Sequence, residues 1–342
     1  MTFLAVILLA VYFSCNVRSE VTPNSKLPIL RYNEDGYLAS SRSSRIVGGT
    51  PAAPGEFQGK ISIQQANLYP LNVYHFCGGT LIHESHVLTA AHCVTTDRGV
   101  VRSPSFFMLV GDELYLSLLS ATRQSRIASH VFVHPDYSIE GILNDVAVIR
   151  TSSPFTVTAT FSPVARIQYS PNVGTSCSVA GWGALFYNGP SPDNLLRINA
   201  TVISRTVCNG PNSYGGAIKS GMICAGDMAG GTDACQGDSG GGLMCGIYVA
   251  GVVSWGAGCA EENLPGVYTD VAAYNSWIDE KIYWAGEQQD IPTPTTVAIT
   301  TPTTPTTPPS FPSHGTAAVL SFGLISLCLC VLTAAHLDWR VI

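Results

Sequence analysis

The sequence predicts an all-β fold of barrel type with one helix near its end. Glycine- or proline-bearing turns separate short strand-like runs, a pattern typical of barrels. A single helix-like stretch, Ala272–Tyr283, follows the last of these runs. The runs themselves are apolar or alternating, and they are Gly79–Ile82, Phe107–Val110, Asp145–Ile149, Cys177–Gly181, Ala200–Ile203 and Tyr248–Ser254.

Length and charge narrow the function classes. The 342 residues leave room for two domains' worth of core plus tails. The net charge of −6 disfavours nucleic acid as a partner. Charged residues make up 12% of the chain, against about 25% in an average globular protein. The uncharged or apolar termini account for part of that deficit.

Residues 1–19 are predicted to be a signal peptide. An apolar run from Phe3 to Phe13 is followed by the small residues Val17 and Ser19 before a cut. The segment lacks a basic start, but the run is too short for a transmembrane anchor. Entry into the secretory pathway makes disulfides expected. Of the eleven cysteines, eight lie in the central region, and sequence alone leaves their pairing open.

The run Asp233–Gly241 is the strongest chemical motif. It places Ser239 in a glycine-rich turn directly after Asp238. A serine hydroxyl is a poor nucleophile unless a base takes its proton, and glycines let backbone N–H groups surround an oxyanion. Taken alone, the string also fits a tight turn.

Two further segments favour the chemical interpretation. His92 precedes Cys93, which a disulfide to Cys77 would fix in place. Asp145 leads into an apolar run, where an acid is ordinarily a strand-end cap. With a serine and a histidine present, Asp145 is the expected third member, which orients the imidazole.

These motifs resemble those of the trypsin-like serine proteases. The order His92, Asp145, Ser239 is the chymotrypsin-type order. The resemblance covers about Ile46 to Ile282, and further motifs agree with it: Arg45–Gly49, Gly181–Gly183, Ser254–Gly256 and Pro265–Tyr268. It implies two six-stranded antiparallel β-barrels with the catalytic cleft between them. The first barrel would carry His92 and Asp145, and the second Ser239.

The resemblance implies a function for each site residue. His92 would be the base for Ser239, with Asp145 orienting it, and the N–H groups of Gly237 and Ser239 would form the oxyanion hole. No metal or organic cofactor is needed. The substrate-binding residues would be Asp233, Ser254, Trp255, Gly256 and Gly266. An acid at the pocket base between small walls predicts cleavage after Arg or Lys in protein or peptide substrates.

Family resemblance also implies the disulfides and the activation step. The pairs would be Cys77–Cys93, Cys177–Cys245, Cys208–Cys224 and Cys235–Cys259, each contributing roughly 2–4 kcal/mol. Residues 20–45 would be a propeptide that another trypsin-like protease removes after Arg45. The new Ile46 amine would then pair with Asp238 and order the oxyanion loop. Turn capping is the alternative role for Asp238.

Three local features qualify the resemblance. Gly242 stands where the family usually has proline. The loop from Gly111 to Arg126 corresponds to a calcium loop, but Thr122 replaces its closing glutamate, so a plain surface hairpin is expected. Asn199 begins a glycosylation sequon on an expected exposed strand.

The chain changes character after the protease domain, which is predicted to span 46–285. Residues 286–315 are Thr/Pro-rich and predict an extended, O-glycosylated stalk. Residues 316–336 are predicted to be a transmembrane helix or a GPI signal tail, since Thr316–Ala335 is uncharged and long enough to span a bilayer. The ending His336–Arg340 favours the helix. The predicted location is the extracellular face of the plasma membrane, with shedding as a variant.

Two other protein classes fit parts of the sequence. A catalytically inactive protease homologue would bind partners without cleaving them, but such chains usually lose a triad residue. A mucin-like surface protein would explain the stalk and leave the triad and Asp233 unexplained. Labelling by a fluorophosphonate separates the enzyme from both, because only an activated serine reacts.

Overall fold

The computed structural model describes residues 49–66, 74–118, 120–285 and 340–341. All of them lie within one compact unit, Ser44–Ile342. The predicted signal peptide, propeptide, stalk and C-terminal apolar span fall outside the described residues. Within the described ranges, no helix has both the length and the apolar character needed to cross a membrane.

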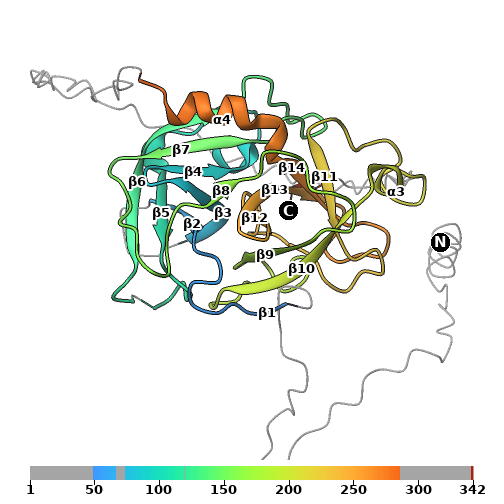
Figure 1. The fold of residues 1–342 in the computed structure, drawn as a ribbon, viewed down its shortest axis with the longest axis horizontal. Helices are drawn as coiled ribbons and strands as arrows, with labels where there is room; N and C mark the ends of the chain where they lie inside the picture. The colour runs from blue at the N-terminus through green and yellow to red at the C-terminus, as the bar shows by residue number, and fades with distance from the viewer. Residues whose placement is uncertain (1–48, 67–73, 119, 286–339, 342) are drawn as a thin grey trace, which may run out of the picture. The chain divides into compact units, whose positions relative to one another are not determined.

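The first barrel closes from six antiparallel strands in the order β2-β3-β4-β7-β6-β5 (Figure 1). Its strands are β2 (Lys60–Gln65), β3 (Tyr74–His83), β4 (His86–Thr89), β5 (Phe107–Gly111), β6 (Gln124–Val133) and β7 (Ala147–Thr151). Branched and aromatic side chains fill its interior, which is the expected content of a small barrel. Fully buried members include Ile61, Ile63, Leu88, Leu109 and Ile149.

The second barrel uses six later strands and closes where β9 pairs with β10. These strands are β9 (Ser176–Gly181), β10 (Leu196–Ile203), β11 (Met222–Gly226), β12 (Gly242–Cys245), β13 (Tyr248–Gly256) and β14 (Gly266–Asp270). The predicted all-β fold with two six-stranded barrels is therefore confirmed. One of the boundaries that differ bears on the site: β7 begins at Ala147, so Asp145 precedes the strand and belongs to the connecting loop.

Short elements complete the sheets and connections. β13 also pairs in parallel with β8 (Ala165–Arg166) at Tyr248 and Val249, and antiparallel with β15 (Arg340–Val341) at Trp255 and Gly256. The remaining elements are β1 (Thr50–Pro51), α2 (Ala91–Val94), η1 (Pro104–Phe106), β8 (Ala165–Arg166), α3 (Arg205–Cys208), η2 (Val271–Tyr274), α4 (Asn275–Ile282) and β15 (Arg340–Val341).

The predicted C-terminal helix is present and packs against the first barrel. It forms as η2 continued by α4, close to the predicted Ala272–Tyr283. Ile278 of α4 is fully buried in the same cluster as the first barrel's core. Arg166, in the connection between the barrels, donates to Asn275 Oδ1 at 2.9 Å and also pairs with Asp279. The helix therefore ties the end of the second barrel to the first.

Four disulfides join the eight central cysteines. They are Cys77–Cys93, Cys177–Cys245, Cys208–Cys224 and Cys235–Cys259, the same four pairs that the family resemblance implies. Only the first lies in the first barrel. Cys235–Cys259 ties the turn that carries Ser239 to the loop after β13.

Candidate active site

His92 and Asp145 form a buried hydrogen-bonded pair at the rim of the first barrel. His92 lies on the short helix α2, directly after β4. Its Nδ1 donates to Asp145 Oδ2 at 2.8 Å, and its backbone N–H donates to Asp145 Oδ1 at 2.9 Å. The Asp145 side chain is 1% exposed. This double contact fixes the ring orientation and directs Nε2 away from Asp145, where Cys93 Sγ lies 3.7 Å from it.

The second barrel completes the environment of Asp145. Ser254 Oγ, on β13, donates to Asp145 Oδ2 at 2.5 Å. Thr269 Oγ1, on β14, donates to the Asp145 backbone carbonyl at 2.7 Å. The sequence analysis predicts Ser254 as a substrate-binding residue, and the structure adds a contact of its hydroxyl with the aspartate. Asp145 is thus held from both barrels.

Ser239 opens onto a groove between the barrels. Its backbone carbonyl accepts a 2.7 Å hydrogen bond from Gly78 N of β3, which anchors the serine turn to the first barrel. The groove is lined by His92, Gly237, Ser239 and the Cys77–Cys93 disulfide, among others. Ser239 Oγ has no hydrogen-bond partner among the described residues. Without substrate such contacts are often long, and they tighten when substrate binds.

The turn before Ser239 presents two backbone N–H groups. Gly237 has φ 101°, and a Cβ at this position would lie 3.2 Å from Gly183 Cα. Only glycine fits this backbone without strain. The N–H groups of Gly237 and Ser239 donate to no residue that the structure describes, so both are available to an oxyanion.

Asp233 lies buried at the opposite end of the same segment. It is 3% exposed, and its Oδ1 accepts a 2.8 Å bond from Ala234 N. A Cβ on Gly266 would lie 2.9 Å from Asp233 Oδ1 and 3.1 Å from the Tyr268 ring, so glycine there keeps the carboxylate accessible. Burial raises the pKa of Asp233 to about 7. A cation that enters and restores the charge balance would bind strongly.

Comparison with known proteins agrees with this geometry. The family model described as Trypsin matches residues 46–278. A trypsin from Xenopus laevis is 38% identical over 248 residues, covering 72% of this chain and 95% of the relative. Trypsin-1 from Salmo salar is 37% identical over 245 residues, covering 71% and 93%. Serine protease 1 from Canis lupus familiaris is 38% identical over 241 residues, covering 70% and 90%.

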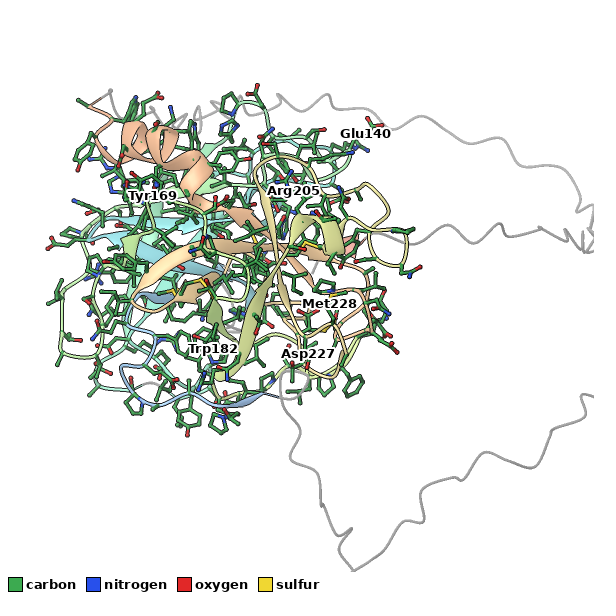
Figure 2. The ribbon with its side chains drawn as sticks, turned by 45° about the vertical axis from the view of Figure 1, so that its right-hand side comes forward. Glu140, Tyr169, Trp182, Arg205, Asp227 and Met228 are labelled. Atoms are coloured by element: carbon green, nitrogen blue, oxygen red, sulfur yellow. A yellow bond between two sulfur atoms is a disulfide. The ribbon has the colours of Figure 1, made fainter. Side chains whose placement is uncertain are left out.

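The chain belongs to the trypsin family of serine endopeptidases. In this trypsin-family chain, the Gly181–Gly183 motif makes room for the Asp238 carboxylate. A Cβ on Gly181 would lie 1.9 Å from Asp238 Oδ1, and one on Gly183 2.4 Å from Oδ2. Asp238 accepts 2.9 Å bonds from the backbone N–H groups of Gly183 and Cys235. Trp182 between the glycines is buried (Figure 2). The predicted activation residues Arg45 and Ile46 lie outside the described residues.

Sequence reasoning missed a series of hydrogen-bonded side chains that supports the turn Cys235–Ser239, here called the oxyanion turn. His75 Nε2 lies 3.0 Å from Gly237 O, and its Nδ1 lies 2.8 Å from Ser62 Oγ. Gln64 Nε2 in turn donates to Ser62 Oγ at 3.0 Å. Burial, reinforced by the charge of Lys60, lowers the pKa of His75 to about 3. A neutral ring therefore donates to Gly237 O and accepts from Ser62. The polar alternation of Ser62 and Gln64 in β2 was the available signal.

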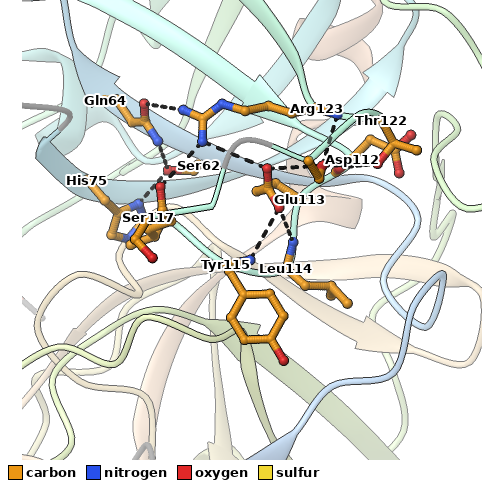
Figure 3. Close-up of polar contacts among 12 residues, drawn as sticks. Ser62, Gln64, His75, Asp112, Glu113, Leu114, Tyr115, Ser117, Thr122 and Arg123 are labelled. Carbon is orange, nitrogen blue, oxygen red and sulfur yellow. Dashed lines mark hydrogen bonds and ion pairs between the residues drawn. The ribbon is translucent and has the colours of Figure 1, made fainter. Parts of the chain in front are cut away.

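The acids of the loop from Gly111 to Arg126 have partners within the protein, among them Arg123 beside Glu113 (Figure 3). The Asp112 carboxylate accepts bonds from Thr158 Oγ1 at 3.1 Å and Thr160 Oγ1 at 2.9 Å. Glu113 Oε2 lies 3.8 Å from the Arg123 guanidinium, which also donates to Leu116 O. The loop carboxylates therefore already have hydroxyl and guanidinium partners.

The predicted glycosylation residue can also be placed. Asn199 is exposed on β10, in a groove that Asp227 and Met228 also line (Figure 2). Among the described residues, one group has the composition of a metal site: Cys77, His92 and Cys93, which line the groove at Ser239. Its two cysteines form a disulfide, so they offer no thiolate to a metal.

Proposed function

We propose that this protein is a secretory-pathway serine endopeptidase that cleaves after Arg or Lys and is made as a zymogen. The observation that carries the specificity is Asp233, a buried carboxylate with a glycine wall at Gly266. A lysine or arginine side chain supplies the counter-charge that this carboxylate lacks. An apolar side chain would leave the charge buried and unpaired, which is costly.

The proposed reaction is acyl transfer through Ser239. His92 Nε2 takes the Ser239 proton as the oxygen attacks the peptide carbonyl, and His92 then protonates the leaving amine. Asp145, held through Nδ1, fixes the tautomer and stabilises the imidazolium. The N–H groups of Gly237 and Ser239 bind the oxyanion, each worth roughly 3 kcal/mol. Water repeats the sequence on the acyl-enzyme and releases the second product.

The edge of β13 is the proposed binding strand for the substrate. In this structure Trp255 and Gly256 pair antiparallel with β15 of the same chain. The edge therefore has backbone groups that can receive an extended peptide by strand addition. Ser254, Trp255 and Gly256 would in this way align a substrate whose basic side chain reaches Asp233.

The proposed activation is cleavage after Arg45 by another trypsin-like protease. The Asp238 carboxylate is fully buried, and among the described residues its hydrogen bonds come only from backbone N–H groups. The Ile46 amine would supply a cation there. Arg45→Gln is expected to be secreted but poorly active, and N-terminal sequencing of the active wild type should begin at Ile46. An active enzyme in which Arg45 is still joined to Ile46 would contradict this step.

The proposed location is the outer face of the plasma membrane, with a C-terminal anchor in residues 316–336. The uncharged run Thr316–Ala335 after a Thr/Pro-rich stalk supports it. Phospholipase C treatment of intact cells distinguishes the two anchors: release of activity means GPI, and retention means a helix. Activity found wholly in the medium with the tail still attached would contradict both.

The decisive functional test is a peptide-library cleavage profile of the activated enzyme. We expect Arg and Lys on the acyl side of every favoured bond. The matched control is Ser239→Ala, which removes the nucleophile and should give no cleavage. Efficient cleavage after apolar residues by the wild type would contradict the assignment of Asp233.

A further inference from the structure

Lys60 is a buried lysine whose charge the fold does not require. It is the first residue of β2 and is 9% exposed. Its Nζ has no hydrogen-bond partner among the residues described. Lysines are almost never buried unless they are paired. Because replacing a buried ion by an apolar group of similar volume is often neutral or stabilising, fold stability does not explain this ammonium.

The ammonium lies against the turn that carries Asp238 and Ser239. A Cβ on Gly78 would lie 2.8 Å from Lys60 Nζ, and one on Gly241 2.9 Å from it, so these glycines leave the space that the ammonium fills. Gly241 N donates to the Asp238 backbone carbonyl at 2.9 Å. The Trp182 ring centroid is 5.6 Å from Nζ. Lys60 thus reaches from the first barrel into the oxyanion turn of the second.

The charges of Lys60 and Asp238 act on each other. Burial raises the pKa of Asp238, and the Lys60 charge opposes that rise. Burial likewise lowers the pKa of Lys60 to about 8, against the opposing effect of Asp238. Lys60 is therefore mostly protonated near neutral pH. The neighbouring His75 is held neutral, so it supplies no competing cation.

We propose that Lys60 is a positioning residue that serves as a built-in counter-ion for Asp238 and partly orders the oxyanion turn before propeptide cleavage. The inference rests on the proposed zymogen activation. A carboxylate that already has a nearby cation and two N–H donors can stay in place without the Ile46 amine. The uncleaved chain should therefore retain reactivity at Ser239, and cleavage should raise that reactivity by a smaller factor than it would without Lys60.

The test compares uncleavable chains that differ at residue 60. Full-length Arg45→Gln and Arg45→Gln/Lys60→Met are treated with a fluorophosphonate, and the rate of Ser239 labelling is measured. We expect measurable labelling of the first and labelling slower by about fivefold or more in the second, because the ordered turn becomes a minor state. The cleaved Lys60→Met enzyme should label within about twofold of the cleaved wild type, since the Ile46 amine then supplies the cation.

Two controls separate positioning from a merely structural role. Lys219→Met removes an exposed lysine and should leave both rates unchanged. Thermal unfolding of Lys60→Met should show equal or higher stability, with Lys60→Gln as the substitute if the methionine variant does not fold. Equal labelling of the two uncleaved chains, or no labelling of Arg45→Gln, would overturn the proposal. A cleaved wild type that resists the label would contradict the proposed protease function itself.

Discussion

The two barrels share a strand count and antiparallel pairing but differ in what they contribute. The first barrel supplies the histidine and aspartate on short, tightly paired segments, with one disulfide. The second supplies Ser239, which we propose as the nucleophile, the two N–H groups proposed for the oxyanion hole and the buried Asp233, with three disulfides. Most glycines with positive φ also lie in the second barrel.

Under the proposed function, this difference separates acid–base chemistry in the first barrel from substrate recognition in the second. The His92–Asp145 pair needs only orientation, which β4, α2 and the loop before β7 provide. Recognition needs backbone groups turned toward a ligand, and these occur in turns such as that at Gly237. Turns of this kind have few strand hydrogen bonds, so covalent links such as Cys235–Cys259 restrain them.

The largest expected effect tests the division of roles between the barrels. Ser239→Ala should lower kcat by roughly 10⁶-fold, and Asp145→Asn by roughly 10⁴-fold, since the nucleophile is indispensable and the aspartate only orients its base. Both variants should fold and be secreted. Steady-state hydrolysis of an arginyl amide measures the two values. An alanine variant within a few fold of the wild type would rule out Ser239 as the nucleophile.

The next effect concerns the recognition side alone. Asp233→Ser should lower kcat/KM for arginyl substrates by about 30-fold or more, because the substrate cation loses its buried partner at a cost of roughly 2–5 kcal/mol. Hydrolysis of an activated ester with an apolar side chain is the control and should not fall. If both substrate classes lose activity equally, Asp233 supports the fold and does not select the substrate.

A smaller effect is expected where the first barrel supports the second. His75→Phe removes the donor to Gly237 O and should lower kcat roughly tenfold with little change in KM, the cost of about one buried hydrogen bond. Ser62→Ala leaves that donor in place and should have a weaker effect. A change confined to KM would show that His75 does not act through the oxyanion turn.

The smallest effect is an opposite response of the barrels to acid. Burial lowers the pKa of His75 to about 3 and that of His86 to about 4, from 6.5. Below pH 6.5 the unfolded chain binds more protons at these sites, so the first barrel loses stability as the pH falls. The pKa of Asp233 is raised from 3.8 to about 7, so acidification between those values relieves a penalty in the second barrel.

Hydrogen exchange at pH 7.5 and pH 5, corrected for intrinsic rates, measures this difference. Peptides from β3 and β4 should lose protection at the lower pH, whereas those around β14 should hold theirs. Equal loss in both barrels would contradict the assignment of these buried groups.

The residues proposed as catalytic stand out in the sequence because each lies in a distinctive local motif, and the structure places His92 and Ser239 on one groove. His92 adjoins a cysteine, and Ser239 lies in a glycine-rich turn. Lys60 and His75 lack such a context, since their roles arise where β2 and β3 meet a turn far along the chain. The contact of His75 with Gly237 joins positions 162 residues apart. Local sequence patterns carry no information about contacts between residues so far apart in the chain.

The fold class and some of the strands could be predicted from the sequence, but other strands could not. The exposed and buried alternation of β10 made that strand visible. β2 was missed because both of its faces are buried: Ser62 and Gln64 are fully buried together with Ile61 and Ile63. The residues of β2 do alternate between apolar and polar, but polar side chains that are satisfied inside the protein look like surface residues in the sequence, so burial of both faces could not be predicted.

The hydrogen bond from Ser254 to Asp145 has a consequence for biosynthesis. It joins positions 109 residues apart, one in each barrel. A ribosome finishes the first barrel well before Ser239 and Ser254 have been made. The growing polypeptide therefore contains His92 and Asp145 before Ser239 exists. A fragment cleaved between the barrels would likewise lack either the serine or its histidine and aspartate. A partly made chain therefore cannot cleave its neighbours, because the residues proposed for catalysis come together only in the last stage of folding.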